Sequence, residues 1–203
     1  DKNILNDHLL SGLQTKGVPQ NLQNTVFPFH YNRFDELERL VNNHEIGVIK
    51  MEVERSTEPE NNFLKKVRKL ATDHKIVLIF DECTSGFRET FGGLHKKYSV
   101  EPDMAMFGKA MGNGYAITAV IGRREIMEEA QSTFISSTFW TERIGPTAAL
   151  KTLEIMEREK SWEVITKLGK EIRNRTKKLA NNYDLKVSIK GIPALTGFSI
   201  DSK

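Results

Sequence analysis

A near-continuous apolar run from Lys75 to Phe80 limits what this chain can fold into more than any other segment. Such a run is typical of a strand covered on both faces, as in the parallel sheets of α/β proteins. A second strand is expected at 46–52, and apolar residues at helical spacing fill 61–74 between the two. Strand, helix and strand in this order form a βαβ unit. The sequence therefore predicts an α/β fold with a mostly parallel sheet flanked by helices.

The remaining elements are also read from the spacing of apolar residues. Residues 102–107 and 115–122 are expected to add buried strands to the sheet, and long amphipathic helices are expected over about 145–182. Beyond the helices, 185–189 and 196–200 alternate polar and apolar residues, like strands of a small separate sheet. The sequence thus predicts one large sheet and one small one.

Two chemically useful side chains follow the strands of the large sheet. Asp81 comes directly after the first apolar run, and Lys109 comes after the strand expected at 102–107. Ligands of open α/β sheets bind outside the carboxyl ends of the strands, so an acid and an amine are expected at one edge. A carboxylate that keeps a pyridine nitrogen protonated and a lysine that holds an aldehyde as a Schiff base are the two protein groups that pyridoxal phosphate requires.

Neither residue type is informative alone. An aspartate after a strand is more often a turn former or helix cap, and a lysine near a strand end is usually solvated. Lys109 stands out because it precedes Gly112 and Gly114, and because no other lysine lies between Lys97 and Lys151. If it acts as a nucleophile and proton shuttle, we expect it to be desolvated, since burial lowers the pKa of an amine.

Residues 80–88, Phe-Asp-Glu-Cys-Thr-Ser-Gly-Phe-Arg, resemble the signature of the class III (fold-type I) pyridoxal-phosphate-dependent aminotransferases. The segment around Lys109 follows at the distance of that family's cofactor-binding lysine, and the chain is most similar to the glutamate-1-semialdehyde 2,1-aminomutase-like branch. The resemblance implies pyridoxal phosphate as cofactor, with a Schiff base at Lys109, which also moves the proton, and with Asp81 at the ring nitrogen.

Two further cofactor-binding residues are implied by the resemblance alone. In the family, the residue two positions after the aspartate packs on the cofactor ring, and Cys83 stands at this position, where valine is usual. A threonine before the helix that begins near Pro146 gives its hydroxyl to the cofactor phosphate in the dimer partner's site, and the matching residue is Thr138. Read without the resemblance, that stretch is an ordinary loop. Glu82 and Arg88 fit either partners of the site or a surface ion pair.

The resemblance also implies an overall organisation and activity. It covers nearly the whole chain but only the middle of a family member, so that 1–160 would be part of the cofactor-binding large domain and 161–203 the start of a small α+β C-terminal domain. The implied activity is amino-group transfer on a small amino acid, aldehyde or keto substrate, in a homodimer with shared active sites. Aminotransferase and aminomutase share these motifs, and a non-catalytic relative or inactive fragment remains the alternative.

Composition excludes other classes of function. The net charge of +3 over 203 residues, without a Lys/Arg-rich block, argues against nucleic-acid binding. No stretch approaches the length of a membrane span. Cys83 is the only cysteine, so an internal disulfide is impossible and a reducing compartment is favoured. We therefore expect a cytoplasmic protein without a nucleic-acid or membrane partner.

Overall fold

The computed structural model of the 203-residue chain describes residues 17, 19–22, 24–139 and 141–200, which divide into two compact units. The first unit comprises residues 1–46 and the second residues 47–203. In the described part of the first unit, a short 3-10 turn, η1 (Gln20–Leu22), precedes helix α2 (Phe34–Asn43). The acidic first turn of α2 suits the positive end of its helix dipole. The second unit carries both sheets.

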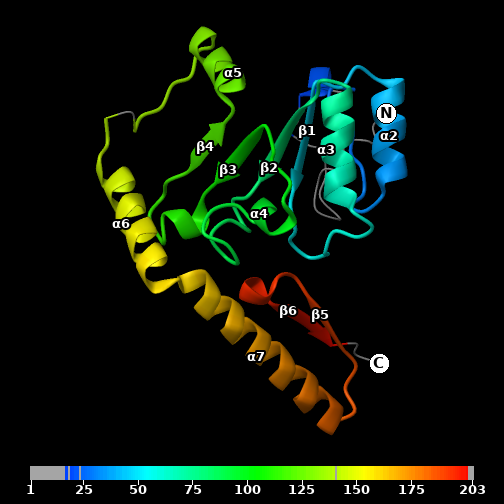
Figure 1. The fold of residues 1–203 in the computed structure, drawn as a ribbon, viewed down its shortest axis with the longest axis vertical. Coiled ribbons are helices and arrows are strands. Elements are labelled where there is room, and N and C mark those ends of the chain that lie inside the picture. The colour runs from blue at the N-terminus through cyan, green and yellow to red at the C-terminus, as the bar shows by residue number, and fades with distance from the viewer. Residues whose placement is uncertain (1–16, 18, 23, 140, 201–203) are drawn as a thin grey trace. The chain divides into compact units, whose positions relative to one another are not determined.

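The large sheet has the strand order β1-β2-β3-β4 (Figure 1). Its strands are β1 (Val48–Glu52), β2 (Val77–Asp81), β3 (Met104–Phe107) and β4 (Ala119–Gly122). The first three strands run parallel to one another, and β4 pairs antiparallel with β3. The predicted α/β fold with a mostly parallel sheet is therefore confirmed.

The βαβ unit forms as predicted. Helix α3 (Phe63–Asp73) joins β1 to β2 and buries one side of its surface. Phe63 and Val67 from the helix and Leu78 and Phe80 from β2 are at most 2% exposed. Burying a side chain of this kind contributes about 1.5–3 kcal/mol. The apolar run therefore forms the central strand of the core, and its carboxyl end is firmly placed.

The strand expected at 115–122 differs from the prediction in length and burial. Only Ala119–Gly122 forms a strand, and Val120 and Ile121 are 43% and 57% exposed. β4 ends the sheet and has a neighbour on one side only, so it lacks the cover of a central strand. Residues 115–118 form an irregular segment instead, since Gly112 and Gly114 turn the chain before it.

Asp103, just before β3, joins three elements through its buried carboxylate. Its Oδ2 accepts hydrogen bonds from the Leu78 backbone N–H and from Arg68 Nη1, both at 2.8 Å, and its Oδ1 accepts one from Arg123 at 3.1 Å. Burial alone would raise the pKa of Asp103, but these donors outweigh it and hold the pKa below the ordinary value of 3.8. The carboxylate before β3 thus ties α3, strand β2 and the residue that follows β4 together.

Replacing Asp103 with alanine should lower the free energy of unfolding by about 3 kcal/mol, because the largely buried Arg68 would lose the carboxylate that balances its charge. The folded-state pKa is lowered, so this stability is fully present above the unfolded pKa and is lost as the pH falls through the folded pKa. Urea unfolding between pH 7 and pH 2 measures both effects. The exposed Asp73→Ala is the matched control, and equal losses in the two variants would contradict the prediction.

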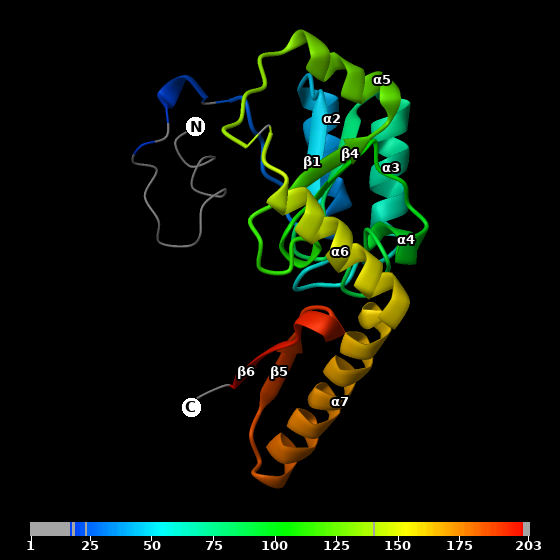
Figure 2. The ribbon, with the colours of Figure 1, turned by 90° about the vertical axis from the view of Figure 1, so that its left-hand side faces the viewer.

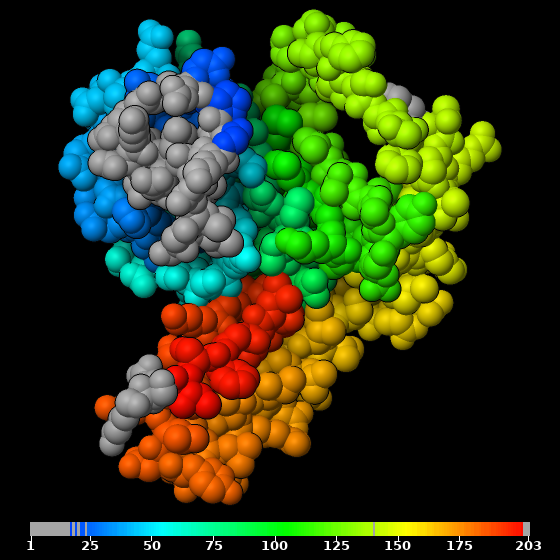
Figure 3. Space-filling view, turned by 180° about the vertical axis from the view of Figure 1, so that it is seen from behind, coloured from blue at the N-terminus to red at the C-terminus, as the bar shows by residue number. Residues whose placement is uncertain are grey.

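The second half of the unit is helical and ends in the small sheet. After α4 (His95–Tyr98), β3 and β4 come α5 (Arg124–Met127), α6 (Ile144–Glu159) and α7 (Ser161–Asn182). Strands β5 (Val187–Lys190) and β6 (Gly197–Ile200) form a separate antiparallel pair, as predicted, and lie along α7 (Figures 2 and 3). None of the helices in the described ranges is long and apolar enough to cross a membrane.

Close packing fixes the small sheet to α7. The 3-10 turn η4 (Pro193–Leu195) meets the helix at Gly169, where an added Cβ would lie 1.9 Å from the Pro193 carbonyl oxygen. Arg173 donates to Thr196 Oγ1 and to the Gly191 carbonyl oxygen. The chain changes direction at Lys160, whose φ of 48° separates α6 from α7. This turn coincides with the domain boundary predicted at 160/161, which stays a prediction.

Candidate active site

Asp81 and Lys109 lie at the same edge of the large sheet. Asp81 is the last residue of β2, and Lys109 follows the end of β3 and opens the 3-10 turn η2 (Lys109–Met111). β2 and β3 are parallel neighbours, so their carboxyl ends meet. Lys109 Nζ donates to Thr84 Oγ1 at 2.6 Å, which ties the amine to the segment that follows Asp81. The structure thus brings the acid and the amine to one edge.

The backbone at Lys109 adopts an uncommon conformation. Its φ is +46°, in the left-handed region that residues other than glycine rarely enter and that is enriched at functional sites. The preceding Gly108 allows close approach, because an added Cβ would lie 3.3 Å from Thr118 Cγ2 and 3.6 Å from Cys83 Sγ. This turn directs the chain away from the sheet as soon as β3 ends.

Lys109 is exposed rather than desolvated, which corrects the expectation from sequence. It lines an open cavity of about 450 Å³ together with Gly114, Tyr115 and the residues up to Thr118. The irregular segment 114–118 thus forms the other wall of this cavity. The cavity gives a ligand direct access to Lys109.

The Asp81 carboxylate is engaged at both oxygens. Its Oδ2 accepts a hydrogen bond from Lys50 Nζ at 2.9 Å, and its Oδ1 accepts one from the Cys83 backbone N–H at 3.2 Å. Burial alone would raise the pKa of Asp81, but the bonds from Lys50 and Cys83 hold it below its ordinary value. Asp81 is therefore a fixed, ionised carboxylate at neutral pH.

Cys83 lies between the two predicted groups as a half-buried thiol. Its Sγ is close to Gly108, the residue before Lys109. Burial, and next the charge of Asp81, raise the pKa of the thiol. A protonated thiol is a small apolar group and a poor nucleophile. The geometry suits the packing role that the resemblance implies.

Glu82 is fully buried, which excludes a surface ion pair for it. Its carboxylate accepts hydrogen bonds from the Ser85 hydroxyl, from the His95 backbone N–H at 3.0 Å and from His95 Nδ1 at 2.9 Å. Burial alone would raise the pKa of Glu82, but these bonds lower it. The network fastens the loop that carries Cys83 and Thr84 to α4. Glu82 therefore stabilises the loop that carries Cys83 and Thr84, and of the two roles that the sequence left open it is a partner of the site.

Arg88 takes a structural place at the end of the same loop. It is half-buried, and its backbone N–H donates to the Ser85 carbonyl oxygen at 3.3 Å. Its own carbonyl oxygen accepts a hydrogen bond from Thr166 Oγ1 of α7 at 3.2 Å. Arg88 thus connects the loop after β2 with the long helix.

Thr138 lies in the exposed loop between the 3-10 turn η3 (Glu128–Ser132) and α6. Within the described part of the chain, no hydrogen bond or ion pair joins it to Asp81, Cys83 or Lys109. The structure therefore groups three of the four predicted site residues and leaves Thr138 apart. Thr138 is therefore available to contact a second subunit.

Tyr115 and Glu142 connect the cavity wall with α6, and sequence reasoning missed both. The Glu142 carboxylate caps the helix by accepting hydrogen bonds from the backbone N–H groups of Ile144 and Gly145, at 2.5 and 2.9 Å. Tyr115 donates its hydroxyl to Glu142 at 3.2 Å, and its ring lies against Gly145, where an added Cβ would sit 3.1 Å away. The available signal was Glu142 itself, an acidic residue shortly before the helix expected near Pro146, where a carboxylate suits the positive end of a helix.

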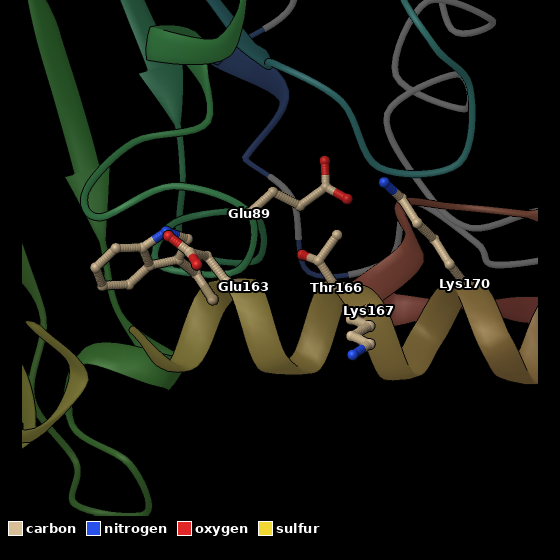
Figure 4. Close-up of a pocket in the computed structure, with 6 residues that line it drawn as sticks. Glu89, Glu163, Thr166, Lys167 and Lys170 are labelled. Carbon is tan, nitrogen blue, oxygen red and sulfur yellow. The ribbon is translucent and has the colours of Figure 1, made fainter. Parts of the chain in front are cut away.

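A second hollow, of about 390 Å³, lies elsewhere in the unit. Glu89 from the loop before α4 lies over α7, which contributes the remaining lining residues (Figure 4). These are Trp162, Glu163, Thr166, Lys167 and Lys170. Charges of both signs line the hollow, and none of the predicted site residues does. The cavity at Lys109 is therefore the better candidate for an active site.

Comparisons with known proteins identify the family. Residues 56–203 match the family model of the class-III aminotransferases. The chain is 36% identical over 186 residues to a 3-aminobutyryl-CoA aminotransferase of Cloacimonas acidaminovorans, covering 87% of this chain and 45% of that protein. It is 34% identical over 179 residues to a glutamate-1-semialdehyde 2,1-aminomutase of Sulfolobus acidocaldarius, covering 82% and 43%. The chain belongs to the class-III aminotransferase family, as its signature predicted.

Solved structures agree with this assignment. An omega-transaminase from Sphaerobacter thermophilus superposes with a TM-score of 0.80 at 25% identity, over 92% of this chain and 44% of that one. The FumI protein of Sphingopyxis gives a TM-score of 0.81 at 21% identity, over 85% and 44%, and supports the fold alone. The chain spans less than half the length of these relatives.

Proposed function

We propose that this protein is a pyridoxal-phosphate-dependent enzyme that transfers an amino group, as an aminotransferase or a 2,1-aminomutase, on a small amino acid, aldehyde or keto substrate. The observation that carries the proposal is the pair formed by Asp81 and Lys109, an ionised carboxylate and an amine at the carboxyl ends of adjacent parallel strands. Membership of the class-III family supports it.

The residues at this edge fit the cofactor chemically. When bound, pyridoxal phosphate supplies the electron sink that allows a proton to leave the amino-bearing carbon. Asp81 would hold the ring nitrogen protonated, since its own carboxylate stays ionised. Lys109 would carry the aldehyde on Nζ and, when released from it, take up and return the proton. The open cavity beside Nζ admits a small substrate.

Two neighbouring residues would position these groups. Thr84 holds the Lys109 amine through the 2.6 Å hydrogen bond to its hydroxyl. Cys83, with its protonated thiol between Asp81 and Gly108, would pack on the cofactor ring. Neither residue has to change its protonation state for these tasks.

Covalent labelling tests the proposal directly. The full-length protein is incubated with pyridoxal phosphate and reduced with borohydride, and the labelled peptide is mapped by mass spectrometry. We expect a single label on Lys109. A label on another lysine, or none, would contradict the assignment. A label on Lys109 without amino transfer from any donor would identify a non-catalytic cofactor-binding relative.

The same preparation separates the two reaction types. An aminotransferase requires an added keto or aldehyde acceptor for continued turnover, whereas an aminomutase moves the amino group within one substrate. Turnover that persists after every external acceptor has been removed would therefore identify the mutase.

We also propose that the protein acts as a homodimer in which Thr138 binds the cofactor phosphate of the partner's site. A hydroxyl in an exposed loop is a suitable phosphate ligand. Large apolar side chains around it are exposed in this chain, including Phe134, Phe139 and Ile144, at 96%, 71% and 64%. Light scattering of the purified protein measures the assembly, and a stable monomer that retains activity would overturn this proposal. We further propose a cytoplasmic location, which the single cysteine supports, because cysteines of proteins in a reducing compartment stay unpaired.

A further inference from the structure

Lys50 is a charged residue in the middle of strand β1, between two buried apolar residues. It stands between Ile49 and Met51 in β1, which are 3% and 8% exposed, and its own side chain is 52% exposed. Alternate residues of a strand share a face, so Lys50 points to the same side of the sheet as Glu52. The register pairs Glu52 with Asp81 on β2. Lys50 thus reaches along the sheet toward its functional edge.

The ammonium group of Lys50 ends 2.9 Å from Asp81 Oδ2. Asp81 Oδ1 is taken by the Cys83 N–H, so Lys50 is the charged partner of the carboxylate in the described structure. A carboxylate has about four acceptor sites on its two oxygens, and Asp81 can therefore accept a further N–H while it keeps both bonds. Any second cation at Asp81 would share the carboxylate with Lys50.

Positive and negative side chains lie close together at this edge of the sheet. Glu52 lies beside Asp81, and its carboxylate accepts a hydrogen bond from Arg55 at 3.4 Å. Burial raises the pKa of Glu52, and the charge of Asp81 adds to this effect, while Arg55 and Lys109 oppose it. Two carboxyl groups and two lysines are thus close enough to influence one another. Removal of one lysine charge changes the potential at Asp81.

We propose that Lys50 is a positioning residue that shares Asp81 with the ring nitrogen of the cofactor and weakens the hold of Asp81 on the ring-nitrogen proton. This inference rests on the proposed function of Asp81. The ammonium group keeps the carboxylate ionised and in place, but it also cancels part of the negative potential that would hold a second proton nearby. Lys50 therefore adjusts how strongly the ring nitrogen is protonated, while Asp81 provides the contact.

Cofactor affinity tests the inference. Lys50→Met keeps most of the side-chain length and removes the charge, whereas Lys50→Arg keeps the charge. We expect Lys50→Met to bind pyridoxal phosphate about twofold to fivefold more tightly at low salt, a size typical of partly exposed ion pairs, and Lys50→Arg to bind like the wild type. Because an exposed charge is screened, the gain should shrink in 1 M salt. Absorbance titration of the full-length protein measures the dissociation constants.

An analogue of the cofactor with carbon in place of the ring nitrogen provides the decisive control. It cannot carry the ring proton, so Lys50→Met should not change its affinity. Lys69→Met, which removes the lysine of an exposed pair with Asp73, should change neither affinity. Equal gains for both ligands, no gain for pyridoxal phosphate, or a loss of affinity would overturn the role of Lys50.

Failure of this inference can be told apart from failure of the proposed function. If borohydride labels Lys109 in the wild type but Lys50→Met binds both ligands as the wild type does, the role of Lys50 is disproved and the proposed function still holds. If Lys109 is not labelled in the wild type, both the proposed function and the inference fall.

Discussion

Replacing Lys109 with alanine should abolish covalent attachment of pyridoxal phosphate and lower the rate of amino transfer by at least about 10²–10⁴-fold, the usual contribution of a positioned proton-transfer group. Lys109 is the amine at the edge where β2 and β3 end, and it lines the open cavity there. Alanine removes both the nucleophile and the proton carrier. Stopped-flow absorbance of the cofactor after mixing with an amino donor measures the rate.

Two further variants make this result specific. Lys109→Arg keeps a positive charge near Thr84, but its guanidinium group stays protonated and cannot attack an aldehyde, so it should be as inactive as alanine. Lys151→Ala removes an exposed lysine on α6 whose ion pair in the described part of the chain is with Glu154, and it should retain full activity. A Lys109→Ala protein that still yields the borohydride label would disprove the role.

Replacing Asp81 with asparagine should lower the rate of amino transfer by about 10²–10³-fold, comparable with the loss of one preorganised charge-stabilising group at an active site. Asparagine keeps an oxygen that can accept the hydrogen bond from the Cys83 N–H, so the loop after β2 should hold its conformation. It removes the charge that lets Asp81 hold a ring nitrogen protonated. The absorbance band of the bound cofactor and the rate constant for proton removal together report this loss.

The controls for Asp81 separate charge from fold. Asp81→Glu restores the charge and should recover part of the activity, whereas Asp73→Asn on α3 should have no effect. The melting temperature of Asp81→Asn should stay close to that of the wild type, because the side chain is near the surface end of the strand and retains its backbone partner. Wild-type activity in Asp81→Asn would exclude this residue from the chemistry.

Local apolar spacing was enough to predict most of the elements. The run ending at Phe80 and the helical pattern over 61–74 gave a strand and a helix close to the observed β2 and α3. The small sheet after α7 was also predicted, because alternation in 185–189 and 196–200 is a local property. The same reasoning failed for 115–122, since a short apolar run does not reveal whether its strand lies at the centre or at the edge of a sheet.

Some features of the candidate site could likewise be predicted from the sequence, and others could not. Asp81 and Lys109 could be found in the sequence because each follows a recognisable strand and parallel strands end at a common edge. The exposure of Lys109 could not, because it depends on the course of 114–118 in space. Burial of Glu82 against His95, thirteen residues further along the chain, likewise depends on how the loop after β2 folds back onto α4.

The sequence by itself determined the α/β class, the family and the two groups that define the chemistry, because these follow from local periodicity and from a contiguous motif. Only the tertiary structure decided the partners of those groups. Lys50 meets Asp81 across 31 residues of chain, and Arg68 and Arg123 meet at Asp103 across 35 and 20. Such pairs are set by strand register and helix packing, which single-sequence patterns do not encode.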